Sequence, residues 1–259
     1  MDRIRRVRLD ARLSEGAVRS RIEEFSEENS SRVHGFSSDD VVSQAAVKDL
    51  LPGGETVYLE EPTVAGGLCY RVIKRIFDVL ASAAALTVLS VPMALVAVHI
   101  KLESPGPAIY SQVRVGWKGR TFRIYKFRSM YVDAENDGPR WASKGDARVT
   151  PFGRKLRESR FDEVPQFWNV MKGDMSLVGP RPERPVFCDA FEKRISGWHY
   201  RNLVKPGLSG LAQVVGGYEM LPGEKVALDL DYIRRRSIGL DIWIMFHTLP
   251  VVAEKRNAR

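Results

Sequence analysis

The chain has few of the residues that cross-link small proteins or bind transition metals. It holds two cysteines, Cys69 and Cys188, among 259 residues, too few for a disulfide framework or a cysteine-based zinc site. Its four histidines stand singly, without the close spacing of histidine-ligated metal centres. Metal chemistry through these side chains is therefore not expected, whereas a cation held by carboxylates remains open.

The composition as a whole fits neither a disordered chain nor a bundle of membrane helices. Apolar residues make up 44% and charged residues 28% of the chain, as in ordinary folded proteins of one or two domains. The charge is uneven: residues 1–70 carry 9 basic and 13 acidic side chains, and residues 71–259 carry 31 and 19. This basic body predicts an anionic partner, and composition leaves nucleic acid, lipid headgroups and phosphorylated metabolites open.

Residues 1–69 form a polar extension that we expect to be largely disordered. They are rich in Ser, Glu and Gly and poor in large apolar residues, so burial cannot offset the entropy of ordering them. A short helix over residues 39–50 is compatible with the pattern. The arginines near the start could contact anionic lipid, but a solvated tail is the simpler interpretation.

An apolar run of twenty residues without a formal charge extends from Val79 to Val98. A helix of that length measures about 30 Å, the thickness of a bilayer's hydrocarbon core, and a buried core helix is the alternative. Pro92 interrupts the run and Ser90 is placed to bond to the freed backbone. Basic residues flank both ends, so neither end prefers the far side of a membrane. We therefore predict that residues 70–103 form a re-entrant helix broken near its middle.

The remaining residues, 104–259, are expected to form a domain that contains short strands. β-Branched and aromatic residues at 108–113 and 121–127, separated by glycines, predict two strands joined by a turn. Alternation along the second strand puts Lys126 and Arg128 on one face. They are either surface charges or a cationic edge that contacts phosphate. A polar loop over residues 133–146 and a basic helix over 151–160 follow.

The segment with the strongest chemical signal contains Asp162 and Glu163. Pro165 is tolerated only in the first turn of a helix, which places both acids at a helix N-terminus, where carboxylates, phosphate and a divalent cation can gather. The alternative is that the acids simply mark a helix start. Arg181 follows between Pro180 and Pro182, whose rings fix the backbone around a guanidinium suited to phosphate. The spacing is consistent with phosphoryl transfer.

Apolar side chains near the C-terminus leave two interpretations open. Residues 238–252 are too short to span a bilayer and form either an interfacial helix with Trp243 at headgroup level or a core-packing helix. Phe187, Phe191 and Trp198 raise the same choice for the helix after Pro185. The predicted fold class is mixed α/β and helix-dominated, with a re-entrant membrane helix, short strands and interfacial amphipathic helices.

An ordered series of motifs between about residues 70 and 250 resembles the bacterial sugar transferase family, the monotopic phosphoglycosyl transferases. The series comprises Lys74-Arg-Ile-Phe-Asp78, Ser104-Pro-Gly-Pro107, Tyr125-Lys-Phe-Arg-Ser-Met130, Asp162-Glu163, Asn169-Val-Met-Lys-Gly-Asp-Met-Ser176, Val178-Gly-Pro-Arg-Pro182, Lys205-Pro-Gly207 and Leu228-Asp-Leu-Asp-Tyr-Ile233. The resemblance implies transfer of a sugar-1-phosphate from a UDP-sugar to undecaprenyl phosphate, with release of UMP and a requirement for Mg²⁺. It also implies an active site on the cytoplasmic face of the inner membrane.

The resemblance assigns roles to individual residues. Asp162 matches the nucleophile that forms a phosphosugar-aspartyl intermediate, Glu163 its catalytic partner, and both are expected to hold Mg²⁺. The expected contacts to phosphate and nucleotide are Arg181, Lys126, Arg128 and Asp229. For Asp229 a structural salt bridge is the equal alternative.

Two departures from the family pattern affect these expectations. Val91 separates Ser90 from Pro92 where relatives have the pair adjacent, and Leu211, Val215 and Gly217 stand where relatives often carry Trp, Asn and Arg. The sugar therefore stays open, as does a homo-oligomer. A catalytically silent membrane scaffold for polysaccharide assembly is the alternative function. No nucleic-acid partner is expected, because no recognised nucleic-acid module is present.

Overall fold

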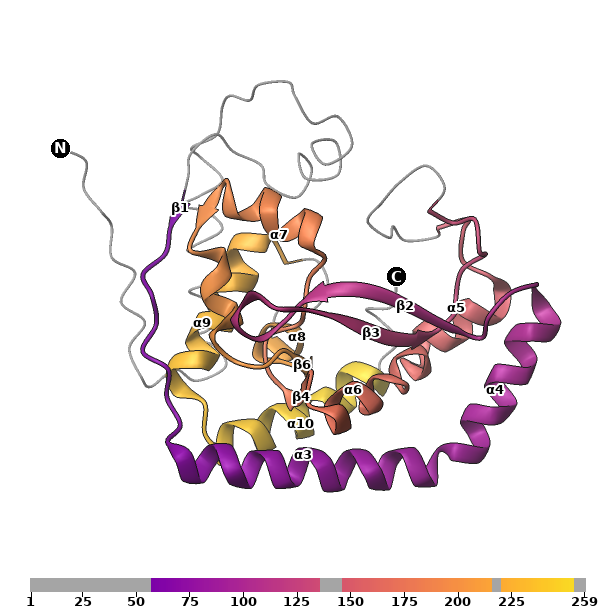
Figure 1. The fold of residues 1–259 in the computed structure, drawn as a ribbon, viewed down its shortest axis with the longest axis horizontal. Helices are drawn as coiled ribbons and strands as arrows, with labels where there is room; N and C mark the ends of the chain where they lie inside the picture. Colours follow the sequence, from indigo (N-terminus) through magenta and orange to yellow (C-terminus); the bar gives the residue numbers. More distant parts are fainter. Residues whose placement is uncertain (1–56, 136–145, 216–219, 254–259) are drawn as a thin grey trace.

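A computed structural model describes residues 57–135, 146–215 and 220–253, and it has the expected mixed α/β, helix-dominated architecture (Figure 1). The possible helix at 39–50 and most of the polar loop, residues 136–145, lie outside the described residues, as do residues 1–56 of the extension. Within the described ranges, one long helix, α3 (Leu68–Val88), runs along an edge of the molecule and the other elements lie to one side of it.

The apolar run folds as two helices, α3 and α4 (Ser90–Glu103), bent by 60°. The break falls at Leu89, and Pro92 lies in the first turn of α4, where its missing N–H is not needed. The Ser90 hydroxyl donates to the carbonyl of Thr87 at 2.8 Å, so it bonds to the backbone at the break, as predicted from its position.

Hydropathy and length set this helix pair apart within the described residues. No single helix there is both long and apolar enough to cross a bilayer, but α3 and α4 together reach that length and hydropathy. Large apolar side chains around the break are exposed, among them Leu80, Val88, Val91 and Leu95, each at least 65% exposed. The pair therefore presents an apolar surface that the rest of the described protein does not cover.

The opposite face of α3 is polar and binds the domain. The Arg75 guanidinium donates to the carbonyls of Val170 and Met171 at 2.6 and 2.8 Å, at the C-terminal end of α6 (Gln166–Lys172). The buried Asp78 carboxylate accepts the backbone N–H of Leu177 at 3.0 Å, in strand β4 (Ser176–Val178). These bonds fix α3 to the elements that carry the site.

A β-hairpin and a short helix lie against the end of α4. The hairpin pairs β2 (Ile109–Val115) with β3 (Thr121–Phe127) antiparallel, across the short 3-10 turn η1 (Trp117–Gly119). Helix α5 (Pro151–Glu158) follows, capped by the Thr150 hydroxyl. The structure thus confirms both predicted strands and the basic helix. Ile100, Phe127 and Leu156 pack together in a small core between α4, β3 and α5.

A larger core joins the C-terminal helices to the short strands. It lies among α7 (Pro185–Glu192), η3 (Trp198–Leu203), α8 (Leu211–Val215), α9 (Pro222–Arg235), α10 (Ile238–Ala253) and the parallel pair of β4 with β6 (Gly207–Ser209). Phe187, Phe191 and Trp198 are all at most 3% exposed, so they pack in the core. In α10, Ile244 is fully buried and Phe246 is 66% exposed, so this helix has one core face and one free apolar face.

The chain before α3 lies across the domain. Its first described residues form β1 (Val57–Tyr58), which pairs in parallel with β5 (Ile195–Ser196). Further along, the Ala65 N–H donates to the Ile233 carbonyl at 3.1 Å. Residues 57–67, expected to belong to the polar extension, are therefore bonded to the domain.

Candidate active site

The acidic pair lies in one turn of 3-10 helix, η2 (Phe161–Glu163), directly before α6. Arg160 ends the preceding segment with a φ of 58°, a left-handed conformation that is uncommon for a residue with a Cβ and recurs at functional sites. Pro165 occupies the N-cap position of α6. The sequence predicted Pro165 in the first turn of a helix with both acids at its N-terminus. The structure places Pro165 one residue before the first turn and the acids in a separate turn ahead of it.

Glu163 is held by two cations from other segments. Its carboxylate accepts a hydrogen bond from Lys126 Nζ on β3 at 2.6 Å and a two-pronged ion pair from Arg181, of which the Nη1–Oε2 bond measures 3.2 Å. Residues from three parts of the sequence that were predicted to share a site therefore meet at this carboxylate. Burial opposes ionisation, but Arg181 and Lys126 outweigh it and hold the pKa of Glu163 well below its usual range.

Asp162 lies beside the same cations, but they offset the effect of its burial far less than they do for Glu163. It is 6% exposed, and its one ion pair among the described residues is with Lys126 Nζ at 3.9 Å. Burial raises the pKa of Asp162 to about 6; Lys126 opposes the rise and the Glu163 charge adds to it. Within the same described ranges no hydrogen bond reaches this carboxylate, so its oxygens are available to a cation or an electrophile.

A cavity of about 560 Å³ opens beside the acidic pair. Nine basic and four acidic side chains line it: Arg114, Lys126, Arg128, Arg148, Arg157, Arg160, Arg181, Arg184 and Lys225, with Glu135, Asp162, Glu163 and Glu183. The excess of positive charge suits a ligand with several phosphate charges. The volume is in the range of pockets for small organic ligands.

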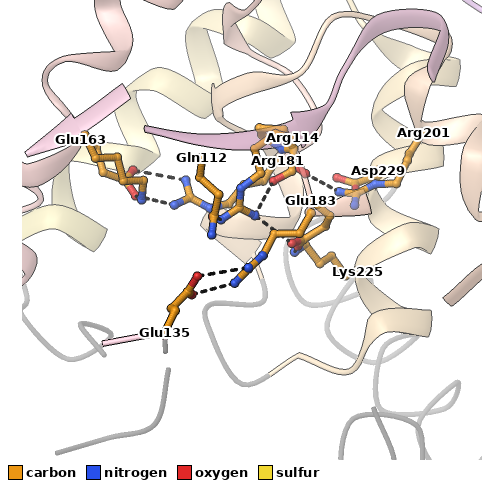
Figure 2. A network of polar contacts seen from close by, with 12 residues as sticks. Gln112, Arg114, Glu135, Glu163, Arg181, Glu183, Arg201, Lys225 and Asp229 are labelled. Carbon is orange, nitrogen blue, oxygen red and sulfur yellow. Dashed lines mark hydrogen bonds and ion pairs between the residues drawn. The ribbon is translucent and has the colours of Figure 1, made fainter. Parts of the chain in front are cut away.

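Arg181 reaches the acids from a rigid segment after β4. Its neighbours Pro180 and Pro182 restrict the backbone, as the sequence predicted, and the Gly179 N–H donates to the Ser209 carbonyl at 2.9 Å, extending the pairing of β4 with β6. Figure 2 shows the Arg181 side chain directed at Glu163. The fork geometry of this ion pair fixes both side chains.

Arg128 lines the cavity, but its guanidinium bonds are made elsewhere. It donates to the carbonyls of Pro105, Ser104 and Ile100 at 2.7, 2.6 and 3.2 Å, and to the Ser104 hydroxyl at 3.0 Å. These are the final groups of α4 and the turn after it, which need donors. Arg128 therefore caps the returning half of the bent pair, and its expected phosphate contact stays a prediction.

Asp229, the remaining predicted residue, is not among the residues that line the cavity and is 1% exposed. Its carboxylate binds Arg201 Nη2 at 2.5 Å, with both side chains 2% exposed. Burial raises the pKa of Asp229, and the Arg201 charge opposes the rise. The salt bridge that was the alternative for Asp229 is thus formed.

Sequence reasoning missed several basic residues of the cavity wall. Arg157 and Arg160 approach from the helix and turn before the acids; Arg157 Nε donates to the Ser129 hydroxyl at 2.8 Å. The basic helix at 151–160 was recognised without a role, and its closeness in sequence to Asp162, which follows Arg157 by five residues and Arg160 by two, was the available signal.

A second missed group surrounds Glu183. Arg114 on β2 and Lys225 on α9 both pair with its carboxylate, the former at 3.3 Å. Burial opposes ionisation, but the charges of Lys225 and Arg114 prevail and lower the pKa of Glu183 to about 2. No motif spacing links residues so far apart, so the sequence held no local signal for this group.

Comparison with known proteins gives one family and several curated relatives. A family described as "Bacterial sugar transferase" matches residues 69–255. A UDP-N-acetylgalactosamine-undecaprenyl-phosphate N-acetylgalactosaminephosphotransferase of Aeromonas hydrophila is 48% identical over 193 residues, covering 73% of this chain and 46% of that protein. A UDP-glucose:undecaprenyl-phosphate glucose-1-phosphate transferase of Caulobacter vibrioides is 44% identical over 191 residues, 71% of each protein.

A third relative, from Bacillus subtilis, is named a putative undecaprenyl-phosphate N-acetylgalactosaminyl 1-phosphate transferase. It is 49% identical over 132 residues, which are 51% of this chain and 74% of that protein. The chain thus spans less than half of the Aeromonas protein and about seven tenths of the other two. The family match over residues 69–255 contains the acidic pair and every residue that lines the cavity.

Proposed function

The chain belongs to the bacterial sugar transferase family, and from this membership and the site we propose that it transfers a sugar-1-phosphate from a UDP-sugar to undecaprenyl phosphate, the first step in assembling a glycan on a lipid. The observation that carries the proposal is the Asp162 carboxylate, which has one long ion pair among the described residues and lies buried at the wall of a cavity whose charged side chains are mainly basic. Such a carboxylate is placed to attack phosphorus once an anionic ligand fills the cavity.

In the proposed first step, an Asp162 oxygen attacks the β-phosphorus of the UDP-sugar. The bond between that phosphorus and the oxygen bridging to the α-phosphate breaks, and UMP leaves with the electron pair. The sugar phosphate is then covalently attached to Asp162. Arg181 and Lys126, fixed on Glu163, lie beside the charge that develops on the phosphoryl oxygens.

In the proposed second step, an oxygen of undecaprenyl phosphate attacks the same phosphorus. The Asp162–phosphorus bond breaks, the carboxylate is restored, and undecaprenyl-diphosphate-sugar is the product. Dividing the exchange into two displacements lets one cavity serve a soluble donor and a lipid acceptor in turn. Glu163, already ionised and paired, fixes the cations while Asp162 changes its bonding.

The side chains present fit the expected Mg²⁺. Asp162 offers oxygens without hydrogen bonds, and Oε2 of Glu163, which accepts one hydrogen bond in the described residues, retains a lone pair. Two carboxylates together with substrate phosphates are the ligands that Mg²⁺ usually takes at phosphoryl-transfer sites. When bound, it would neutralise charge on the diphosphate and the leaving UMP.

We further propose that α3 and α4 enter and leave the inner membrane through its cytoplasmic face. One domain binds both ends of the pair: Lys74 near the start of α3 pairs with Asp241 at 2.7 Å, and Arg128 binds the end of α4. Ends held by one polar domain cannot lie on opposite sides of a bilayer. The exposed apolar side chains at the break support the same placement.

Helix α10 is the proposed interfacial element of the domain. Ile242, Phe246 and Leu249 are 43–66% exposed on it, and a small groove of about 90 Å³ lies between α3 and α10, lined by residues of both, including Phe77 and Met245. A helix with a free apolar face beside the proposed membrane helices would place that face among the lipid headgroups and acyl chains. The acceptor's phosphate would then reach the cavity from the membrane surface.

The test is release of UMP by the purified protein in lipid nanodiscs. With Mg²⁺ and undecaprenyl phosphate, we expect release from at least one of UDP-glucose, UDP-galactose, UDP-N-acetylglucosamine and UDP-N-acetylgalactosamine, and loss of release with EDTA. Asp162→Asn should lower the rate by at least about 10³-fold, because the amide is a poor nucleophile. Its membrane association should be unchanged.

Asp174→Asn is the matched control, since Asp174 is outside the cavity and pairs with Lys172 at 2.9 Å; it should keep nearly full activity. Full activity of Asp162→Asn would refute the nucleophile assignment. No UMP release from any sugar by the well-folded wild-type protein would favour the silent scaffold instead.

A further inference from the structure

The segment that carries Arg181 is fixed through its carbonyl groups. Pro180 and Pro182 have no N–H, so hydrogen bonds to this segment come mainly through its oxygens. The Pro180 carbonyl accepts from the Gly207 N–H at 2.9 Å, and the Pro182 carbonyl accepts from Arg114 at 3.2 Å. Between them the Arg181 carbonyl accepts from Arg201 Nη2 at 2.8 Å.

Arg201 connects this segment to helix α9. The nitrogen that donates to Arg181, Nη2, also binds the Asp229 carboxylate at 2.5 Å. The guanidinium carbon lies 4.5 Å from the ring centre of Trp198, a side chain that is 1% exposed. Figure 2 shows Arg181 between Glu163 on one side and the Arg201–Asp229 pair on the other. One chain of contacts therefore runs from α9 to the acidic pair.

We propose that Arg201 and Asp229 are positioning residues for the transfer reaction. Asp229 orients the Arg201 guanidinium, Arg201 fixes the Arg181 backbone, and Arg181 in turn fixes Glu163 beside the nucleophile. Neither Arg201 nor Asp229 is among the residues that line the cavity, so both act without touching substrate. This inference rests on the proposed function and replaces the direct phosphate or nucleotide contact expected of Asp229.

Distance and burial explain why such a link matters. A misplacement of about 1 Å at a reacting group can lower a rate by about 100-fold. A buried ion pair holds its partners in one geometry, and removing a single member leaves an uncompensated buried charge that destabilises the fold. The test must therefore remove both charges together.

The test variant is Arg201→Met with Asp229→Leu, which keeps apolar volume and leaves no unpaired charge. We expect kcat for UMP release to fall about 10- to 100-fold with less than a threefold change in KM for the UDP-sugar, and the melting temperature to stay within a few degrees. The control is Asp231→Leu with Arg235→Met, an ion pair at 3.0 Å on the same helix. Its kcat should match the wild type.

A double-mutant cycle separates positioning from general damage. In an Arg181→Ala background the Arg201/Asp229 change should lower kcat no further, because its effect passes through Arg181. Additive losses, or a kcat equal to that of the Asp231/Arg235 control, would overturn the inference.

Two further measurements keep the inference decidable. If the double variant does not fold, Arg201→Lys, which keeps a charge beside Asp229 but lacks the guanidinium fork, should show a smaller kcat loss and the same dependence on Arg181. If the wild-type protein releases no UMP, the proposed function fails. A structure of the double variant then tests separately whether Arg201 and Asp229 position Arg181. An Arg181–Glu163 pair still in its original place in that structure would contradict it.

Discussion

Glu163 and Glu183 show how neighbouring charges decide the ionisation of a buried side chain. Each is enclosed by the protein, and each has its pKa lowered because two cations outweigh the effect of burial. Burial raises the pKa of Asp162, adjacent to Glu163, because its one ion pair among the described residues, with Lys126 at 3.9 Å, does not offset the effect of burial. Glu163 accepts hydrogen bonds from two cations and Asp162 from neither, and this difference separates a fixed, ionised side chain from an available one.

The lowered pKa of Glu183 predicts a specific acid sensitivity. A carboxyl whose folded pKa is about 2 contributes stability that is fully present above its ordinary pKa of about 4.5 and is lost as the pH falls toward 2. Glu183→Gln should therefore destabilise the protein by about 3 kcal/mol at pH 7, and the difference in melting temperature from wild type should narrow between pH 5 and pH 3. A difference independent of pH, measured by thermal unfolding in one detergent, would contradict this assignment.

The residues of the acidic site could be predicted because each lies in a short, recognisable motif. Asp162, Glu163, Lys126 and Arg181 came from local patterns, and the structure brings all four together. The capping bonds of Arg128 could not be predicted, because they depend on where a helix 24 residues earlier ends. Strand alternation fixes the face on which a side chain lies and says nothing of its partner.

Helix α4 depends at its end on a side chain from β3. The carbonyls at a helix C-terminus lack partners within the helix. For α4 the Arg128 guanidinium supplies the donors, and both Arg128 and Ser104 are buried. The helix that returns from the break is therefore anchored to the hairpin beside the cavity.

Arg128→Met should loosen this anchor. Losing charge-assisted hydrogen bonds to buried carbonyls costs about 3 kcal/mol, which lowers the melting temperature by about 5–10 °C. Arg123→Met, on the exposed face of the same strand and bonded to Ser111 at 3.3 Å, should change it by less than 2 °C. An unchanged melting temperature with a raised KM for the UDP-sugar would instead assign Arg128 to phosphate.

The helices and strands lie close to where the sequence pattern predicted them, but the bend in the apolar run lies earlier than expected. Proline signalled the interruption of the apolar run, but the bend lies at Leu89, three residues before Pro92. A proline removes a bond to the preceding turn, so the helix is weakened on the N-terminal side of the ring and the proline itself starts the next helix. The pairing of β1 with β5 could not be predicted from the sequence, because the partner strand has only two residues.

At the scale of the whole molecule, the bent pair and the domain form one body with an apolar edge. Polar bonds from Arg75 and Asp78 join α3 to the domain on one face, while the face around the break carries exposed apolar side chains. Because the polar domain binds both ends of the α3–α4 pair, this arrangement is consistent with the proposed entry and exit through one face of the membrane.

Cysteine labelling tests that topology directly. Cys69, exposed at the start of α3, and a cysteine introduced as Leu102→Cys near the end of α4 should both resist an impermeant maleimide in spheroplasts and react in inverted vesicles, each in a chain without other thiols. Val88→Cys at the break should react in neither, because it faces lipid. Opposite labelling of the two ends would show a membrane-spanning pair and contradict the proposal.

The short parallel pairing of β1 with β5 has a practical consequence. It fastens the polypeptide at residues 57–58 to a region far from the break at Leu89, across the body from α3 (Figure 1). A fluorophore or affinity handle attached ahead of this strand would therefore join the domain away from the bend between α3 and α4. Immobilising the protein by that handle would keep the apolar edge of the bent pair free to meet a supported bilayer.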